Sequence, residues 1–243
     1  MMSEGDPPGP PETTDVWPPA PTGGQQMPVP QTLGLAPFID LTKFTRVVVG
    51  LLVVNAILGT ISSVLLADDG HYFTSPFVQD FGATIIPCSM LIVLVTVLVF
   101  MDWTNQAYSN LQALGISAPS ESPRSAAAYF VVPLLNVYKP YVIFVEMWQR
   151  SDLDPAIKRS SDTPGVVTLW WLLFLIYSFA FALTFMFARA TVQTAIAASA
   201  IEIMATMLAV MVVTLLTQRQ VTRHRAILAL RNASTVENAP KTE

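Results

Sequence analysis

Glu202 is the one charged residue within the apolar stretch Ala190 to Gln218, and a carboxyl group at that position needs an explanation. An ionised side chain at the centre of a bilayer costs about 3 kcal/mol on insertion scales, so such residues are rare and commonly functional. Small residues share its helical face, which favours close packing of another helix there: Thr194, Ala198, Ala205, Thr206 and Ala209. Two interpretations stay open, a proton or cation site and a protonated carboxyl that is hydrogen-bonded to a neighbour such as Asn55.

The other residue types that carry chemistry are too dispersed to assemble a catalytic or metal site. His71 and His224 fall on opposite sides of the predicted membrane, and the single cysteine, Cys88, lies inside an apolar stretch. Zinc and haem sites need clustered His and Cys ligands. The sequence also contains no His-Glu-x-x-His motif and no phosphate-binding glycine loop, the patterns typical of metalloproteases and nucleotide-binding proteins. We therefore expect no enzymatic activity, no metal and no cofactor.

The elements that must position Glu202 are membrane helices, as the composition indicates. Hydrophobic residues make up 52% of the 243 residues and charged residues only 12%, whereas soluble domains carry about 25% charged residues. Four stretches reach the length of about 20 apolar residues that a helical crossing needs, and they lie at about 47–67, 82–101, 165–188 and 192–216. The predicted fold is an all-α integral membrane protein with four transmembrane helices, contained in a membrane domain at 41–232.

The basic residues predict how these crossings are oriented, because cytoplasmic loops carry an excess of Lys and Arg. With four crossings and a cytoplasmic N-terminus, only Arg189 of the 13 Lys and Arg residues lies outside. A fifth crossing would move Arg150, Lys158, Arg159 and the C-terminal basic residues outside, against this bias. We therefore predict four crossings with both termini in the cytoplasm.

A further apolar stretch at 125–149 is interrupted by Pro133 and Pro140. Its longest uncharged run is too short to cross a bilayer, and proline removes a backbone donor and breaks a helix. The stretch is therefore predicted to be either re-entrant or interfacial, and both alternatives stay open. Beyond Pro140, the apolar periodicity favours an interfacial helix anchored by Trp148, on which Glu146 pairs with the arginine four residues later.

Polar and aromatic residues recur at fixed spacings through the middle of the chain. After the second apolar stretch, a Trp and an Asn stand seven residues apart, and they are followed by P-x-x-N-x-x-K-P-Y and then by Glu-x-Trp. The residues are Trp103, Asn110, Pro133, Asn136, Lys139, Pro140, Tyr141, Glu146 and Trp148. This pattern resembles a bacterial integral membrane family catalogued as a domain of unknown function, number four-three-two-eight, over roughly residues 45–230. The resemblance implies a protein of the bacterial inner (plasma) membrane and carries no known activity.

We favour structural roles for the motif residues over ligand-binding ones. Asn136, between the two prolines, would satisfy backbone groups that the break leaves free, in preference to contacting a lipid head group. Trp103 and Asn110 share a face with apolar residues, which predicts an interfacial helix packed under the bundle. The family commonly has an arginine where this chain has Gln106, so any binding site that depends on that arginine is not expected here.

Both ends of the chain are predicted to be disordered. Residues 1–40 hold ten of the 19 prolines and five acidic residues without any basic one, a composition that cannot bury enough apolar surface to order the chain. Residues 233–243 are assigned to a disordered C-terminal tail. Before that tail, basic residues alternate with apolar ones, which predicts a helix that lies on anionic head groups; they are Arg219, Arg223, Arg225 and Arg231.

Two functions compete on these patterns. The favoured one is a non-enzymatic scaffold or regulatory membrane protein with a cytoplasmic interaction face. The alternative is a small oligomeric transporter or channel in which Glu202 and the broken segment at 125–149 line a path. The expected partners are membrane lipids, including anionic head groups, while a cytoplasmic protein partner and a homo-oligomer both stay open. The net charge of -4 gives no basic field for nucleic acid.

Overall fold

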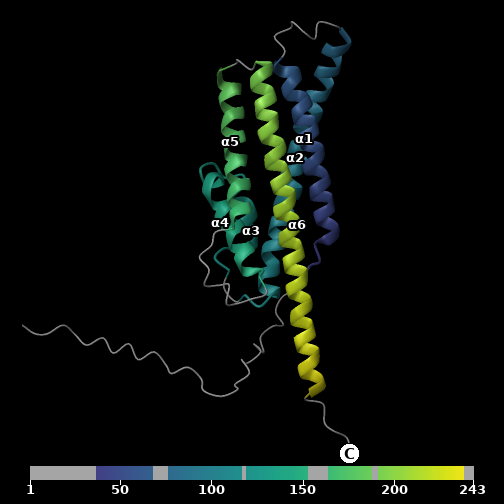
Figure 1. Ribbon diagram of the computed structural model, residues 1–243, viewed down its shortest axis with the longest axis vertical. Helices are drawn as coiled ribbons and strands as arrows, with labels where there is room; N and C mark the ends of the chain where they lie inside the picture. Colours follow the sequence, from purple (N-terminus) through teal and green to yellow (C-terminus); the bar gives the residue numbers. More distant parts are fainter. Residues whose placement is uncertain (1–36, 68–75, 117–118, 153–163, 188–190, 238–243) are drawn as a thin grey trace, which may run out of the picture. The chain divides into compact units, whose positions relative to one another are not determined.

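The computed structural model describes residues 37–67, 76–116, 119–152, 164–187 and 191–237, all of which belong to one compact unit. These residues form six helices (Figure 1): α1 Thr42–Ala67, α2 Pro76–Ala113, α3 Pro123–Ala128, α4 Leu135–Arg150, α5 Gly165–Phe187 and α6 Val192–Glu237. Helices α1, α2, α5 and α6 are long and apolar enough to cross a membrane. The prediction of an all-α membrane protein with four spanning helices is therefore confirmed.

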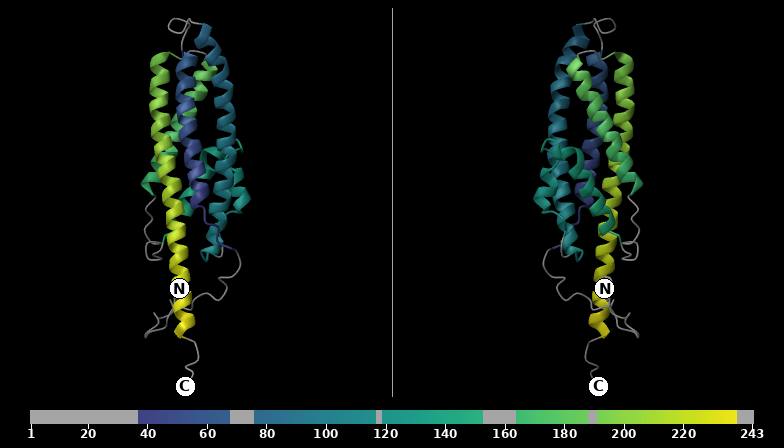
Figure 2. Two further views of the ribbon diagram at one scale, coloured as in Figure 1. Left: turned by 90° about the vertical axis from the view of Figure 1, so that its right-hand side faces the viewer. Right: turned by 90° about the vertical axis from the view of Figure 1, so that its left-hand side faces the viewer.

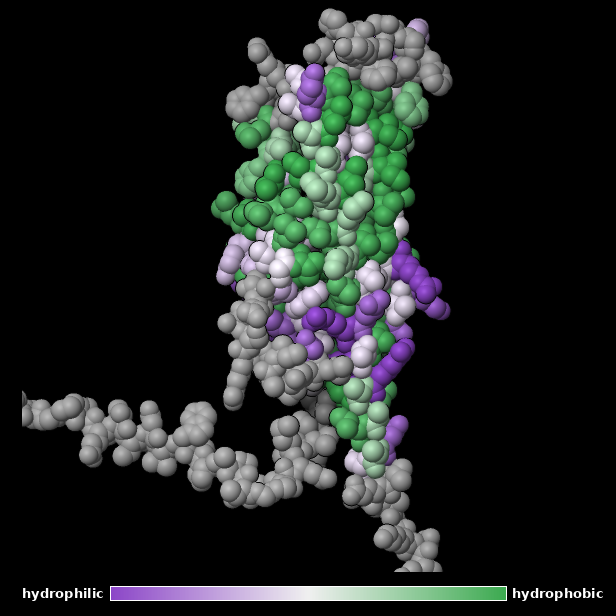
Figure 3. All heavy atoms as spheres, viewed as in Figure 1, coloured by the Kyte–Doolittle hydropathy of each residue, from purple (hydrophilic) through white to green (hydrophobic). Residues whose placement is uncertain are grey.

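The four long helices lie side by side, as the perpendicular views in Figure 2 show. α6 packs along both α1 and α5, and α2 packs along α1. The short helices α3 and α4 pack against α2 and α5 at one end of the bundle, where α1 begins and α2 ends; we call this the α3–α4 end. On the visible face, apolar side chains cover the bundle and hydrophilic ones gather at the α3–α4 end (Figure 3).

Helices α3 and α4 form a hairpin that enters the bundle and returns. Ser122 caps α3 by accepting a hydrogen bond from the Ser125 backbone, with proline following at the first helical position, where its missing N–H costs nothing. The turn after α3 presents apolar side chains, and Leu134, in the left-handed region at φ 66°, is 87% exposed. Trp171 Nε1 donates to the Val137 carbonyl at 3.0 Å. The first turn of α4 thus lies beside the second turn of α5.

Pro140 does not break this segment, contrary to the prediction, because it lies inside α4. Its ring removes one donor, which leaves one helical bond unmade, and it is buried in the bundle. Of the two prolines, only Pro133 lies between helices, in the turn that joins α3 to α4. Phe144 and Met147 of α4 are fully buried and Trp148 packs against the core, so one face of α4 is covered by the rest of the protein.

Two helices run further than the sequence pattern indicated. The segment that carries Trp103 and Asn110 is a continuation of α2, which spans 38 residues, and not a separate interfacial helix. α6 spans 46 residues and continues straight to Glu237 (Figure 1), so residues 233–237 are helical and the extension does not turn onto a membrane surface. At 1.5 Å per residue α6 is about 69 Å long, more than twice a hydrocarbon core of about 30 Å.

An aromatic cluster joins the hairpin to the long helices. The Phe144 ring of α4 lies 4.8 Å from Trp170 and 5.9 Å from Phe100, measured between ring centroids. Trp170 and Trp171 are both nearly fully buried. Each aromatic pair contributes about 0.5–1.5 kcal/mol beyond its buried area. This packing fixes the hairpin against α2 and α5.

The chain before α1 is tied to the bundle over its last few residues. Phe38 stacks on His224 at 4.1 Å between ring centroids, Ile39 is hydrogen-bonded to Asn110, and Leu41 is buried. The predicted tail at 1–40 therefore ends too late, because 37–40 belong to the folded unit. Its remainder, residues 1–36, and the last part of the C-terminal tail, residues 238–243, lie outside the described residues.

Candidate functional site

Asn110 links three segments at the α3–α4 end. Its side-chain oxygen accepts from the Ile39 backbone N–H at 2.9 Å, and its amide nitrogen donates to the Ile39 carbonyl at 2.9 Å and to Gln220 Oε1 of α6 at 3.2 Å. Gln220 Nε2 in turn donates to the Ala107 carbonyl at 2.8 Å. Asn110 is 1% exposed, and buried amides without partners would be costly. Asn110 of α2 therefore connects this helix both to the segment that precedes α1 and to α6; we call this set of bonds the cross-brace.

Trp103 begins a second chain of hydrogen bonds across the same end. Its indole N–H donates to Thr45 Oγ1 of α1 at 3.0 Å, and that hydroxyl lies 2.7 Å from Thr217 Oγ1 of α6. The Thr217 hydroxyl donates to the Val213 carbonyl at 2.9 Å. Since its proton is used there, Thr45 must be the donor in the bond between the two threonines. The prediction that Trp103 and Asn110 serve packing rather than ligand binding agrees with these contacts.

Glu146 of α4 is a buried carboxylate whose oxygens are all engaged. Tyr108 donates its hydroxyl to Oε2 at 2.7 Å, the Ser120 backbone donates to Oε1 at 2.9 Å, and the Ser120 hydroxyl also donates to Oε2. Arg150 Nε lies 3.2 Å from Oε1, as the i, i+4 spacing predicted. Burial raises the pKa of Glu146, but the bonds from Ser120 and Tyr108 together with the Arg150 charge outweigh burial and hold this pKa below its ordinary value. The carboxylate is thus ionised at neutral pH, and its hydrogen bonds join α4 to α2 and to the segment before α3.

The remaining residues of the hairpin motif are distributed around it. Lys139 Nζ forms an ion pair with Glu121 Oε1 at 2.7 Å, and this bond holds the pKa of the Glu121 carboxyl below its usual range. The Tyr141 hydroxyl lies 3.2 Å from Thr168 Oγ1 of α5. Asn136 Oδ1 is buried without a hydrogen-bond partner, so its predicted role of satisfying freed backbone groups is not seen. The sequence did not single out Glu121, which lies in the turn before α3.

Two of the four arginines predicted to face lipid are instead bound within the protein. The Arg219 guanidinium stacks on the Trp148 ring at 4.0 Å and lies 3.2 Å from Asp152 Oδ2. Arg223 Nη1 donates to the backbone carbonyls of Arg150 at 2.6 Å and Asp152 at 2.7 Å. Their acceptors lie about 70 residues away in the chain, so periodicity along α6 could not reveal them. Arg225 and Arg231, the other two, are exposed.

Glu202 lies at a second polar cluster, between α1, α5 and α6. The side chain is 6% exposed, and Ala205 and Ala209 of the predicted small-residue face are buried, whereas Thr194 is exposed. A Cβ built at Gly59 of α1 would lie 2.5 Å from Glu202 Oε1, so the carboxyl packs directly against the α1 backbone, and a larger residue at position 59 would displace it.

The partners of this carboxyl differ from the predicted one. Tyr177 of α5 lies close enough to interact with Glu202, and it takes the place expected for Asn55. Oε2 of Glu202 and the hydroxyls of Thr60 and Ser199 are buried without hydrogen-bond partners. Sequence reasoning missed Gly59 and Tyr177, because a single Gly or Tyr in an apolar span carries no signal until the helices are paired.

Within the part of the chain that the structure describes, no three or more His, Cys, Asp and Glu side chains gather as metal ligands would. The fold and the hydrogen-bonded α3–α4 end define a multi-pass integral membrane protein in which several motif residues, among them Trp103, Asn110 and Glu146, are bonded to other parts of the chain. Residues 74–224 match the family model described as Domain of unknown function (DUF4328). Since this match covers more than half of the chain, the protein belongs to that family. No curated protein and no solved structure matches the chain.

Proposed function

We propose that the protein is a non-enzymatic scaffold or regulatory protein of the bacterial plasma membrane, with both termini and the α3–α4 end in the cytoplasm. The observation that carries this proposal is the use made of the family motif. The polar groups of Trp103, Asn110 and Glu146 are engaged in bonds to other parts of the chain. Side chains whose hydrogen-bonding groups are used within the chain stabilise the fold, whereas a catalytic side chain must keep a free lone pair or proton for a substrate.

The braced end supports a helix that extends past the bundle. Gln220 and Arg223 fasten α6 to α2 and to the segment after α4, and the helix continues to Glu237 (Figure 1). In that extension Leu230 is 69% exposed, and Leu228 is also exposed. A firmly held helix with exposed leucines between basic residues is suited to helix-in-groove recognition by a partner protein.

Site-specific photo-crosslinking in intact bacterial cells tests this proposal. A photoreactive amino acid at Leu230 should yield a covalent adduct with one defined protein. Ile227→Ser should reduce the adduct, because Ile227 is partly exposed and lies three residues before Leu230, on the same face of the helix. The control position is Met207, which is similarly exposed but lies within an apolar span. Adducts with lipid alone at both positions would contradict a scaffold function.

A second candidate function, a small proton or cation transporter, is favoured by one observation. Three polar atoms on two helices, from Thr60, Ser199 and Glu202, are buried without partners, and such atoms commonly hold a bound ion, a water molecule or a proton. Glu202→Gln, which is nearly isosteric, should abolish a pH-dependent flux in liposomes while leaving the melting temperature unchanged. If flux and growth are both insensitive to Glu202→Gln and Glu202→Ala, Glu202 has no transport function.

A further inference from the structure

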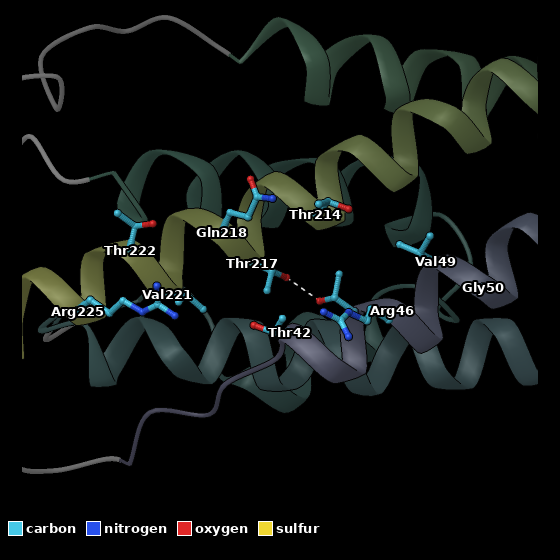
Figure 4. Close-up of a pocket in the computed structure, with 11 residues that line it drawn as sticks. Thr42, Arg46, Val49, Gly50, Thr214, Thr217, Gln218, Val221, Thr222 and Arg225 are labelled. Carbon is cyan, nitrogen blue, oxygen red and sulfur yellow. Dashed lines mark hydrogen bonds between the residues drawn. The ribbon is translucent and has the colours of Figure 1, made fainter.

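A groove runs along the seam between α1 and α6 at the α3–α4 end (Figure 4). It encloses about 700 Å³. Thr42, Arg46 and Gly50 line it from α1, and Gln218, Thr222 and Arg225 line it from α6. Its floor includes the bond between Thr45 and Thr217, drawn as a dashed line in Figure 4. Because Trp103 donates to Thr45, a family-motif residue holds this floor in place.

The same seam continues as an apolar slot further along both helices. The slot encloses about 400 Å³ and is lined by Val53, Ile57 and Ile61 of α1 and by Ile203 and Met207 of α6, among others. Val53 follows Gly50 by one helical turn, so the slot begins where the groove ends. The seam therefore has two chemical halves, one with arginine, threonine and glutamine side chains and the other almost wholly apolar.

The polar half is positively charged. Arg46 and Arg225 are exposed, and Arg225 extends back along the groove toward the first turn of α1 (Figure 4). Lys43 adds a further positive charge nearby. Asp40 caps α1 by accepting from the backbone and side chain of Thr42 at 2.9 and 2.5 Å, and its carboxylate is also attracted to Arg225 and Lys43. Three basic groups therefore face this one carboxylate, and the polar half keeps a net positive charge. Guanidinium groups match the geometry of phosphate oxygens, to which they donate in pairs.

We propose that this seam binds one anionic phospholipid, with its phosphate between Arg46 and Arg225 and an acyl chain along the apolar slot. The lengths agree with this assignment. From Arg46 to Ile61 the strip covers 15 residues, or about 22 Å of helix, which exceeds the thickness of about 15 Å of hydrocarbon in one leaflet. Thr214 and Gln218 of α6 line the groove between Thr222 and the apolar slot, where the glycerol and ester oxygens would follow the phosphate.

The charges also favour a phospholipid over a second copy of the chain. Two copies related by a two-fold axis through this seam would bring Arg46 and Arg225 of one chain toward the same residues of the other. Like charges in contact oppose association, whereas a phosphate neutralises both. The apolar slot is moreover placed in the spans that face lipid, where an acyl chain is already present at high concentration.

Native mass spectrometry of the full-length protein, titrated with phosphatidylglycerol or with phosphatidylcholine of the same acyl chains, tests the proposal. Wild type should retain one phosphatidylglycerol molecule at concentrations where phosphatidylcholine is lost. Arg46→Ala/Arg225→Ala should weaken phosphatidylglycerol retention tenfold or more, since two basic contacts are removed. The control, Lys43→Ala/Arg231→Ala, removes the same charge outside the groove lining and should retain the lipid. Equal retention by the two double variants would overturn the proposal.

A second variant tests the groove itself and keeps the fold intact. A Cβ at Gly50 would meet nothing within 4 Å, so the indole of Gly50→Trp can occupy the groove without displacing protein atoms. Retention of phosphatidylglycerol should fall in Gly50→Trp and persist in Val47→Trp, an exposed position on the same helix, with melting temperatures close to wild type. Unchanged retention in Gly50→Trp would exclude the groove as the binding site.

The same spectra distinguish other occupants. Glycerol phosphate added in excess should not displace the lipid, because it lacks the acyl chain; displacement would show that the site binds a free phosphate compound and would overturn a phospholipid site. A wild-type dimer that separates in Gly50→Trp would show that the seam is filled by a second copy, and that result would also overturn it.

Discussion

Asn110 is bonded to two segments that are distant in the sequence, and the chemistry of its amide determines what a substitution there must cost. A side-chain amide both donates and accepts, so it can satisfy the N–H and the carbonyl of Ile39 at once and still donate to Gln220. Neither Asp nor Ser offers that combination. The bonds reach across 71 and 110 residues of sequence, which makes Asn110 a long-range organiser of the α3–α4 end.

Asn110→Ala should therefore lower the free energy of unfolding by about 2 kcal/mol, because it removes a bond to the buried Gln220 side chain and two bonds to the Ile39 backbone. The measurement is the unfolding midpoint in a mild detergent, followed by far-ultraviolet circular dichroism. Asn232→Ala, at an exposed position of α6, is the matched control and should change the midpoint little. Equal midpoints for the two variants would contradict the cross-brace.

Glu146 makes the stability of this end depend on pH. Its pKa in the folded protein is below the ordinary value of 4.5, so the carboxylate contributes stability above pH 4.5 and this contribution is lost as the pH falls through the lower folded pKa. Glu146→Gln should remove that acid-dependent loss. It should also lower stability at pH 7, since hydrogen bonds from Tyr108 and Ser120 to a charged carboxylate are stronger than those to a neutral amide. Melting temperatures at pH 7 and pH 4 provide the test, with Asp80→Asn at the other end of the bundle as control. A steeper acid loss in Glu146→Gln than in wild type would show that the sign is wrong.

At the scale of the elements, the four spans were predictable because apolar length alone specifies a membrane helix. The extent of α2 and α6 beyond the membrane was not, since a change from apolar to polar residues does not end a helix unless a Gly or Pro follows. Likewise Pro140 marks a break in the sequence pattern, yet α4 continues through it because only one bond is lost and the ring is buried. Glu146 with Arg150 was predictable as a local i, i+4 pair, whereas the partners of Trp103, Asn110 and Arg223 lie on other helices.

The segment before α1 behaves as part of the fold and gives a sharp test of where the folded unit begins. Removal of residues 1–36 should leave the melting temperature unchanged. Removal of residues 1–40 deletes Phe38 and Ile39, which stack on His224 and bond to Asn110, and should lower the melting temperature by several degrees. The two truncations differ by four residues, so equal thermal stability would show that the contacts of 37–40 contribute nothing.

The whole molecule combines two kinds of helix packing that have different chemical origins. Through the spans, small and apolar residues bring α1 and α5 against α6, as around Gly59 and Glu202. At the α3–α4 end, hydrogen bonds from amide, hydroxyl and guanidinium groups hold α6 to α1, α2 and α4. The α6 extension, which we propose binds a partner protein, and the groove, which we propose binds a lipid head group, both lie at or beyond the α3–α4 end. We therefore expect the molecule to function at this end, where polar side chains are available to bind partners.

This arrangement depends on one orientation in the membrane, which accessible cysteines can establish in a Cys88→Ala background. Cysteines at Arg124 in the first turn of α3 and at Asn232 in the α6 extension should be labelled from the same, cytoplasmic side, because we predict that the segment at 125–149 does not cross the membrane. A cysteine at Thr191, between α5 and α6, should be labelled from the other side. All three positions are exposed, so labelling reports sidedness rather than burial. Labelling of Arg124→Cys and Asn232→Cys from opposite sides would require a fifth crossing and would reverse the positive-inside bias on which the proposed cytoplasmic face depends.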